Sequence, residues 1–154
     1  MNLFCETFQS GEAIPVQHTC DGDNLSPPLG WDSVPPRAQS LVLIMDDPDG
    51  PGVRPWAHWL LYALPADTRR LPQAFNPADR GMAGIPGRND FGDAGYGGPC
   101  PPPGPPHTYF IRLYALDTML DLHYGANRQQ LIEAMEGHIL EVAEMQGTYQ
   151  RDTG

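Results

Sequence analysis

Three segments of the chain carry the hydrophobic pattern of β-strands. Residues 40–45 (SLVLIM) form a short continuous apolar run, which is typical of a strand covered on both faces. Residues 57–64 (AHWLLYAL) and 108–116 (TYFIRLYAL) are rich in aromatic and aliphatic side chains, and Pro65 and Asp117 end them. All three runs indicate central strands. The segments between them hold too much proline for a crossover helix, which favours an antiparallel, sandwich-like sheet over a parallel one.

A helical pattern follows near the end of the chain. Asn127 is suited to cap a helix, and Gln130 occupies the position of a capping-box partner. Gly137 inside the segment lowers helix stability by about 1 kcal/mol relative to alanine, which burial of the apolar face would offset. Gly147 is the expected end. We therefore predict a C-terminal helix, whose apolar stripe consists of Leu131, Ile132, Met135, Ile139, Leu140, Val142 and Ala143.

Composition narrows the fold class further. The chain has 154 residues, the length of one domain, so we expect residues 1–154 to form a single domain. The 17 glycines and 18 prolines exclude an all-helical bundle, because proline breaks helix interiors and is found in turns and loops.

Charge excludes several functions. Nine basic against 19 acidic residues give a net charge of −10, which is the wrong sign for binding nucleic acid or an anionic bilayer. Every basic residue is an arginine, so a phosphate-loop lysine or a Schiff-base lysine is excluded. No apolar run approaches 18 residues, and the first eight residues lack the pattern of a signal peptide. We expect a soluble, cytoplasmic protein without integral membrane contact.

The three cysteines are Cys5, Cys20 and Cys100. Their odd number and the lack of a C-x-x-C spacing argue against a structural zinc site and against a disulfide framework. We expect three reduced thiols.

A stretch rich in glycine and proline spans residues 81–107, where these two residue types fill 15 of 27 positions. A flexible linker is disfavoured because Phe91 and Tyr96 lie inside it. The prolines of Pro99–Pro106 fix the backbone, so we expect a stiff extended wall that delivers His107 into the next strand. Stiff loops of this kind commonly line functional sites.

Two aspartates and two histidines lie at strand ends or loop edges. Asp47 and Asp49 follow the first apolar run, His58 is flanked by tryptophans, and His107 precedes the third run. Taken singly, D-P-D-G-P is a turn signal and a histidine in an aromatic strand is usually a core residue. Taken together, the four side chains could converge in one polar pocket.

These motifs resemble the phosphatidylethanolamine-binding protein family, in the short bacterial branch of Raf kinase inhibitor-like proteins. The resemblance spans almost the whole chain and implies a Greek-key β-sandwich of two antiparallel sheets with a few peripheral helices. It is carried by HTCDGDNLSPPLGW, SLVLIMDDPDGP, PWAHWLLYALP, NDFGDAGYGGPCPPPGPPHTYFIRLYALD and GHILEVAEMQGTYQR.

The resemblance also implies an anion pocket. Thr108 stands where the family commonly has arginine, which weakens recruitment of a charged head group, and Gly50 replaces a common alanine, which loosens the loop. If two thiols do pair, the resemblance favours Cys20 with Cys100, because it places both near the pocket. The pocket residues that it implies are Asp47, Asp49, Gly50, Pro51, His58, Pro101, His107 and Tyr109.

The chemistry of such a pocket follows from its side chains. Carboxylates beside the two histidines favour their charged forms, so each imidazolium can donate to phosphate-type oxygens. A carboxylate beside an anion must accept a proton from it or orient a histidine. Because a net charge of −10 repels anions at long range, the site must act at short range in a partly desolvated cleft.

We therefore expect non-enzymatic binding of a phosphoryl or other anionic group, carried by a phospholipid head group, phosphate or a phosphorylated residue, without a cofactor. The resemblance implies regulatory inhibition of a protein kinase or other enzyme, and a homodimer is left open. The alternative is a divalent-metal-dependent hydrolase that uses the Asp/His cluster, because imidazole and carboxylate suit several transition metals. The sequence has no G-x-S-x-G or H-E-x-x-H motif, and Cys100 is the only conceivable nucleophile.

Overall fold

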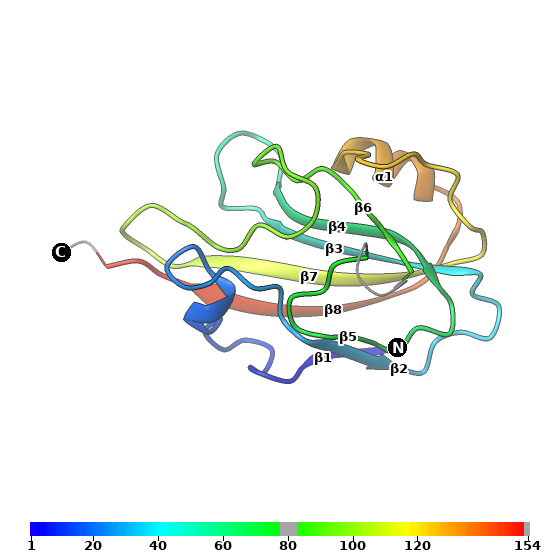
Figure 1. Cartoon of the computed structure of the whole chain (residues 1–154), viewed down its shortest axis with the longest axis horizontal. Helices are drawn as coiled ribbons and strands as arrows, with labels where there is room; N and C mark the ends of the chain where they lie inside the picture. Colours follow the sequence, from blue (N-terminus) through cyan, green and yellow to red (C-terminus); the bar gives the residue numbers. More distant parts are fainter. Residues whose placement is uncertain (78–82, 153–154) are drawn as a thin grey trace.

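Two antiparallel sheets form the framework of the computed structural model, which describes residues 1–77 and 83–152 (Figure 1). The larger sheet has the strand order β6-β4-β3-β7-β8, and the smaller has the order β1-β2-β5. All their strand pairs are antiparallel. The strands are β1 (Asn2–Cys5), β2 (Leu29–Asp32), β3 (Ser40–Asp47), β4 (Trp56–Pro65), β5 (Arg70–Leu71), β6 (Ile85–Pro86), β7 (His107–Leu116) and β8 (Ile139–Tyr149), and the helices are the 3-10 helix η1 (Val16–His18) and α1 (Arg128–Met135).

The three predicted strands are confirmed as β4, β3 and β7, and they occupy the centre of the larger sheet. The mainly β fold with two antiparallel sheets is confirmed with them. Each strand extends slightly beyond its apolar run, so that β3 ends with Asp47 and β7 begins with His107. Two of the polar residues expected at strand ends are thus held by sheet hydrogen bonds.

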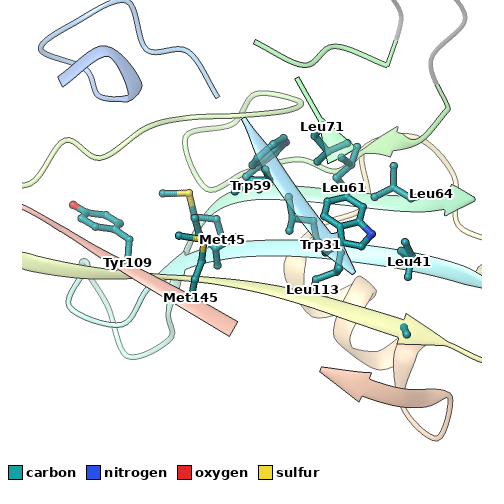
Figure 2. Packing of buried hydrophobic residues seen from close by; sticks show 14 of the residues in the cluster. Trp31, Leu41, Met45, Trp59, Leu61, Leu64, Leu71, Tyr109, Leu113 and Met145 are labelled. Carbon is teal, nitrogen blue, oxygen red and sulfur yellow. The ribbon is translucent and has the colours of Figure 1, made fainter. Parts of the chain in front are cut away.

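One hydrophobic core lies between the two sheets. Figure 2 shows Trp31 of β2 lying over side chains of β3, β4 and β7, among them Leu41, Leu61 and Leu113. These side chains are at most 2% exposed. Full burial of each one contributes about 1.5–3 kcal/mol, so this contact ties the small sheet firmly to the large one.

A second core covers the opposite face of the larger sheet. Leu131 and Met135 of α1 pack there with Val42 and Ile44 of β3. Because side chains alternate along a strand, β3 is apolar on both faces, which explains its continuous apolar run. The same alternation directs Asp46 toward the α1 side, where it pairs with Arg128 at 3.2 Å.

The predicted C-terminal helix is wrong beyond its first two turns. The capping box of Asn127 and Gln130 is present, but α1 ends at Met135. Gly137 adopts φ 81°, a left-handed conformation that ends the helix. Residues Ile139–Tyr149 then pair with β7 along their length. Tertiary pairing with a central strand decides this segment, whose apolar spacing also fits a strand.

The expectation of three reduced thiols is also wrong. Cys20 and Cys100 form a disulfide with Cα atoms 5.4 Å apart, and Cys5 is free. Counting cysteines gives no information on which of them the fold brings together. The proline-rich stretch returns to the loop after η1, where the Cys20 amide donates to the Pro99 carbonyl at 3.1 Å.

In the described ranges, none of the helices has the length and apolar character needed to cross a membrane.

Candidate functional site

A buried aspartate–histidine pair lies at one end of the larger sheet. Since β3 and β7 are antiparallel neighbours, the last residue of β3 lies beside the first residues of β7. The Nδ1 atom of His107 donates to Oδ2 of Asp47 at 2.7 Å, and both side chains are largely buried. This bond orients the ring and leaves Nε2 free for a ligand.

The turn after β3 fixes the second carboxylate. Asp47 Oδ1 accepts from the backbone N–H of Asp49 at 2.7 Å, and Asp49 Oδ2 accepts from the backbone N–H of Thr108 at 3.2 Å. The D-P-D-G segment is therefore both a turn and a tie between β3 and β7. A Cβ atom on Gly50 would lie 2.8 Å from the Cβ of Trp56, so glycine here provides clearance rather than a looser loop.

His58 reaches the same face through a β-bulge. Met45 pairs with Trp59 and Asp46 pairs with Ala57, so one additional residue of β4 lies between these partners. Ala57 packs on the α1 side whereas Trp59 packs between the sheets. The extra residue directs His58 toward the site, as bulges near functional sites commonly do.

The ring of His58 is fixed on three sides. Its Nδ1 lies 2.6 Å from the carbonyl oxygen of Gly97, and a carbonyl only accepts, so Nδ1 carries a proton. The rings of Phe91 and Tyr109 contact it edge-on, each with centroids 5.2 Å away. The ring's remaining polar atom is Nε2.

Burial lowers the pKa of His58, and this effect exceeds the opposing influence of its hydrogen bond to Gly97 and of Asp47. The expectation that carboxylates keep both imidazoles charged is therefore wrong for His58. Desolvation penalises its charged form more than the neighbouring carboxylate favours it. In the neutral ring with Nδ1 protonated, Nε2 is a hydrogen-bond acceptor.

Tyr109 supplies a neutral hydroxyl. Burial raises its pKa far above the ordinary value, and the carboxylates of Asp47 and Asp49 raise it further. The side chain is 1% exposed. The phenol therefore stays protonated at physiological pH and can donate a hydrogen bond.

These groups surround a cleft of about 420 Å³. The structure brings all eight residues implied by the sequence to its lining. Four further lining residues were missed: Trp56, Phe91, Cys100 and Pro102. The sequence signal that could have identified them is position: Trp56 lies two residues before His58, and the other three lie in the glycine- and proline-rich stretch of residues 81–107. The complete lining is Asp47, Asp49, Gly50, Pro51, Trp56, His58, Phe91, Cys100, Pro101, Pro102, His107 and Tyr109.

The lining contains two carboxylates and neither arginine nor lysine. The ligand must therefore be recognised by hydrogen bonds and apolar contacts. In residues 1–77 and 83–152, no group of three or more His, Cys, Asp or Glu side chains is arranged to hold a metal ion.

Known proteins are similar to this chain over nearly its full length. The family model described as phosphatidylethanolamine-binding protein matches residues 5–150. A UPF0098 protein of Methanothermobacter thermautotrophicus is 50% identical over 152 residues, covering 98% of this chain and 99% of that protein. A UPF0098 protein of Aquifex aeolicus is 46% identical, with 99% and 90% covered.

Two crystal structures are similar over nearly their full length. A phosphatidylethanolamine-binding protein homologue from Chlamydia trachomatis superposes with a TM-score of 0.89 at 40% identity, covering 98% of this chain and 97% of that one. E. coli YbcL, described as a member of the mammalian family, gives a TM-score of 0.91 at 30% identity, covering 98% of each chain. With its sequence and its two-sheet fold in agreement, the chain belongs to the phosphatidylethanolamine-binding protein family.

Proposed function

We propose that the cleft binds a phosphomonoester in its singly protonated, monoanionic form, without catalysing a reaction on it. The observation that carries this proposal is the hydrogen bond from His58 Nδ1 to Gly97, which leaves Nε2 as an acceptor. The Tyr109 hydroxyl and, when protonated, the Nε2–H of His107 are the complementary donors. Such a set of one acceptor and two donors matches a phosphoryl group that retains one P–OH.

The charge of the cleft supports the protonated form. A dianionic phosphate would face the carboxylates of Asp47 and Asp49 in a lining that contains neither arginine nor lysine. Two like charges 4 Å apart repel by about 4 kcal/mol at an effective dielectric constant of 20. If the ligand keeps its proton at a pH one unit above the phosphate pKa, the cost is about 1.4 kcal/mol, which is less than this repulsion. Protonation of the ligand is therefore the cheaper way to enter the cleft.

The acceptor atom Nε2 of His58 also distinguishes phosphomonoesters from phosphodiesters. A phosphodiester, such as a phospholipid head group, is singly charged but has no P–OH. It would leave the buried Nε2 of His58 unpaired, at a cost of about 1–3 kcal/mol. A phosphorylated small molecule or phosphorylated residue is thus the favoured ligand, and the phospholipid named in the family's title is the alternative that the experiment separates.

A binding role is supported by the state of the only conceivable nucleophile in the cleft. Cys100 is bonded to Cys20, so no thiolate faces a bound ligand while the bond is intact. His107 and Asp47 can act as a general base, which contributes about 10²–10⁴-fold and falls short of enzymatic rates. The regulatory inhibition of a kinase or other enzyme that the resemblance implies would require a protein partner to carry the phosphoryl group.

Isothermal titration calorimetry tests the proposal. Phosphoethanolamine should bind more tightly at pH 5.5 than at pH 8, because its second pKa is near 6. Glycerophosphoethanolamine, a diester, should bind more weakly than phosphoethanolamine at pH 5.5.

His58→Ala and His107→Ala should each weaken binding of the monoester. His138→Ala is the matched control, because His138 is an exposed histidine that pairs with Asp117 outside the cleft. Tighter binding at pH 8, or unchanged binding in His107→Ala, would contradict the proposal. Preferential binding of the diester would identify a phospholipid head group instead.

A further inference from the structure

The wall of the cleft contains a disulfide. Cys100 lines the cleft and is bonded to Cys20 in the loop that follows η1. Its neighbours Pro101 and Pro102 line the cleft as well. The bond therefore joins a ligand-contacting wall to a segment 80 residues away in the sequence.

Contacts next to the bond fix the position of the wall. The Tyr96 hydroxyl donates to the His18 carbonyl at 2.7 Å, and the Gly98 amide donates to Asn24 Oδ1 at 2.9 Å. The carbonyl of Gly97, between these two residues, holds His58 Nδ1. The anchored segment therefore controls the tautomer of His58, on which ligand recognition depends.

Beyond Cys100 the wall has few other anchors. The five prolines at positions 101, 102, 103, 105 and 106 have no backbone N–H to donate. Gly104 makes two hydrogen bonds, one from its amide to the Arg151 carbonyl and one to its carbonyl from Gln150 Nε2. The disulfide is therefore the covalent tie of the wall to the loop after η1, and it adds to the hydrogen bonds of residues 96–99.

The bond is open to attack by a thiol, because Cys20 and Cys100 are both exposed residues. The guanidinium of Arg151 lies 3.9 Å from the Cys100 sulfur. A cation there stabilises Cys100 as a leaving thiolate, and the Asp21 carboxylate at 3.1 Å from Arg151 moderates this effect. Exposed disulfides are typically the labile, regulatory ones, and those of cytosolic proteins are usually transient.

We propose that the Cys20–Cys100 disulfide is a redox switch for the ligand cleft. Oxidation forms the bond and holds the wall of the cleft in place, and a dithiol reductant breaks the bond and releases the wall. A reductant thiolate bonds to Cys20 Sγ, the disulfide breaks, and Cys100 leaves as a thiolate that takes a proton from water. The second reductant thiol then attacks the mixed disulfide and releases Cys20 as a thiol. The reductant departs as a disulfide, so two electrons reach the protein. The effect on binding rests on the proposed function of the cleft.

The test uses the full chain with Cys5→Ser, in which Cys20 and Cys100 are the only cysteines. Phosphoethanolamine should bind about tenfold more weakly after reduction with dithiothreitol, because ordering the wall then opposes binding. The additional double substitution Cys20→Ser and Cys100→Ser should bind like the reduced protein and should not respond to dithiothreitol. Circular dichroism establishes that both forms are folded. Equal affinity of the folded oxidised and reduced forms overturns the switch and leaves the proposed function intact.

A second measurement does not depend on the ligand. Reduction should increase amide hydrogen exchange of Tyr96, Gly97 and Gly98 and should shift the ¹⁵N resonances of the His58 ring. Arg151→Gln should slow reduction of the bond while leaving oxidised binding unchanged, because Arg151 lies outside the cleft lining. If the oxidised protein fails to bind phosphoethanolamine, the proposed function is wrong. The amide exchange and the His58 resonances still show whether reduction releases the wall. Unchanged exchange and unchanged His58 resonances on reduction would overturn it.

Discussion

His107 Nδ1 and Asp47 Oδ2 lie 2.7 Å apart across the junction of β7 and β3, with 16% and 5% of the respective side chains exposed. An equally short pair, His138 and Asp117 at 2.8 Å, is 45% and 37% exposed. The same interaction is thus present both in the cleft and on the surface. The comparison separates the effect of burial from that of the pair itself.

We predict that Asp47→Asn lowers the free energy of unfolding by about 1.5–3 kcal/mol, because the buried carboxylate accepts from both His107 and the Asp49 amide. Asp117→Asn, the surface control, should lower it by less than about 1 kcal/mol. Urea denaturation at pH 7 measures both values. Equal losses would mean that burial of the Asp47 pair contributes nothing.

Acidification should destabilise the protein below about pH 6.5. Burial lowers the pKa of both His18 and His58 in the folded state, so below the unfolded value the unfolded chain binds more protons. The loss is at most about 1.4 kcal/mol per pH unit for each histidine, and above pH 6.5 it disappears. Urea denaturation at pH 7.5 and 5.5 gives the slope.

His58→Gln should reduce this slope, and the exposed His138→Gln should not. The Asp46 carboxyl acts in the opposite direction at lower pH, because burial raises its pKa, which is why the comparison stops at pH 5.5. A slope that His58→Gln leaves unchanged would mean that folding does not lower the pKa of His58.

Gly137→Ala distinguishes the observed turn from the helix that the sequence indicated. In a helix interior, alanine would stabilise the protein by about 1 kcal/mol. At the observed φ of 81° it should instead destabilise it by about 1–2 kcal/mol, although the added Cβ would meet no neighbour within 4 Å. Thermal denaturation gives the sign of the change. An increase in Tm would favour the helix.

Gly98→Ala should displace the wall of the cleft. A Cβ at this position would lie 2.1 Å from the His18 carbonyl oxygen, so the backbone must move, at a cost of about 1–3 kcal/mol. Phosphoethanolamine binding should weaken as well, because a shift of Gly97 would displace the His58 ring that is hydrogen-bonded to its carbonyl. Gly52→Ala is the control, since its Cβ would meet nothing within 4 Å and only backbone strain is added. Binding that survives Gly98→Ala unchanged would separate the wall from recognition.

The protein should show no hydrolase turnover on a panel of ester, phosphoester and peptide substrates, with or without added Mn²⁺ or Zn²⁺. The physical reason is that the cleft offers no activated nucleophile and that, among the described residues, no three His, Cys, Asp or Glu side chains are arranged to hold a metal ion. Turnover that disappears in both His58→Ala and His107→Ala, with the fold intact by circular dichroism, would establish the metal-dependent alternative or another enzyme.

Local sequence patterns predicted the central sheet because each of its three middle strands is marked by a run rich in aliphatic and aromatic residues. The same runs located Asp47 and His107, since strand ends can be read from the change to polar residues. The direction of His58 was not accessible, because it depends on a bulge that appears only when β4 pairs with β3.

Segment 139–149 was misassigned for a related reason. Ile139, Leu140, Val142 and Ala143 fit a helical period, while the buried alternation of Ala143, Met145 and Gly147 fits a strand. Only the presence of an unpaired edge on β7 decides between them. The disulfide likewise depends on which loops meet, and neither the number nor the spacing of cysteines encodes that.

The adjacent aspartates at the end of β3 make the cleft sensitive to the length of this strand. Asp46 pairs with Arg128 of α1 on one face, and Asp47 pairs with His107 on the other. Loss of a single residue from the apolar run would exchange these two carboxylates between faces together with every core side chain of the strand. Substitutions in the loop that follows, at residues 51–55, therefore disturb the cleft far less than an insertion or deletion before Asp46 would.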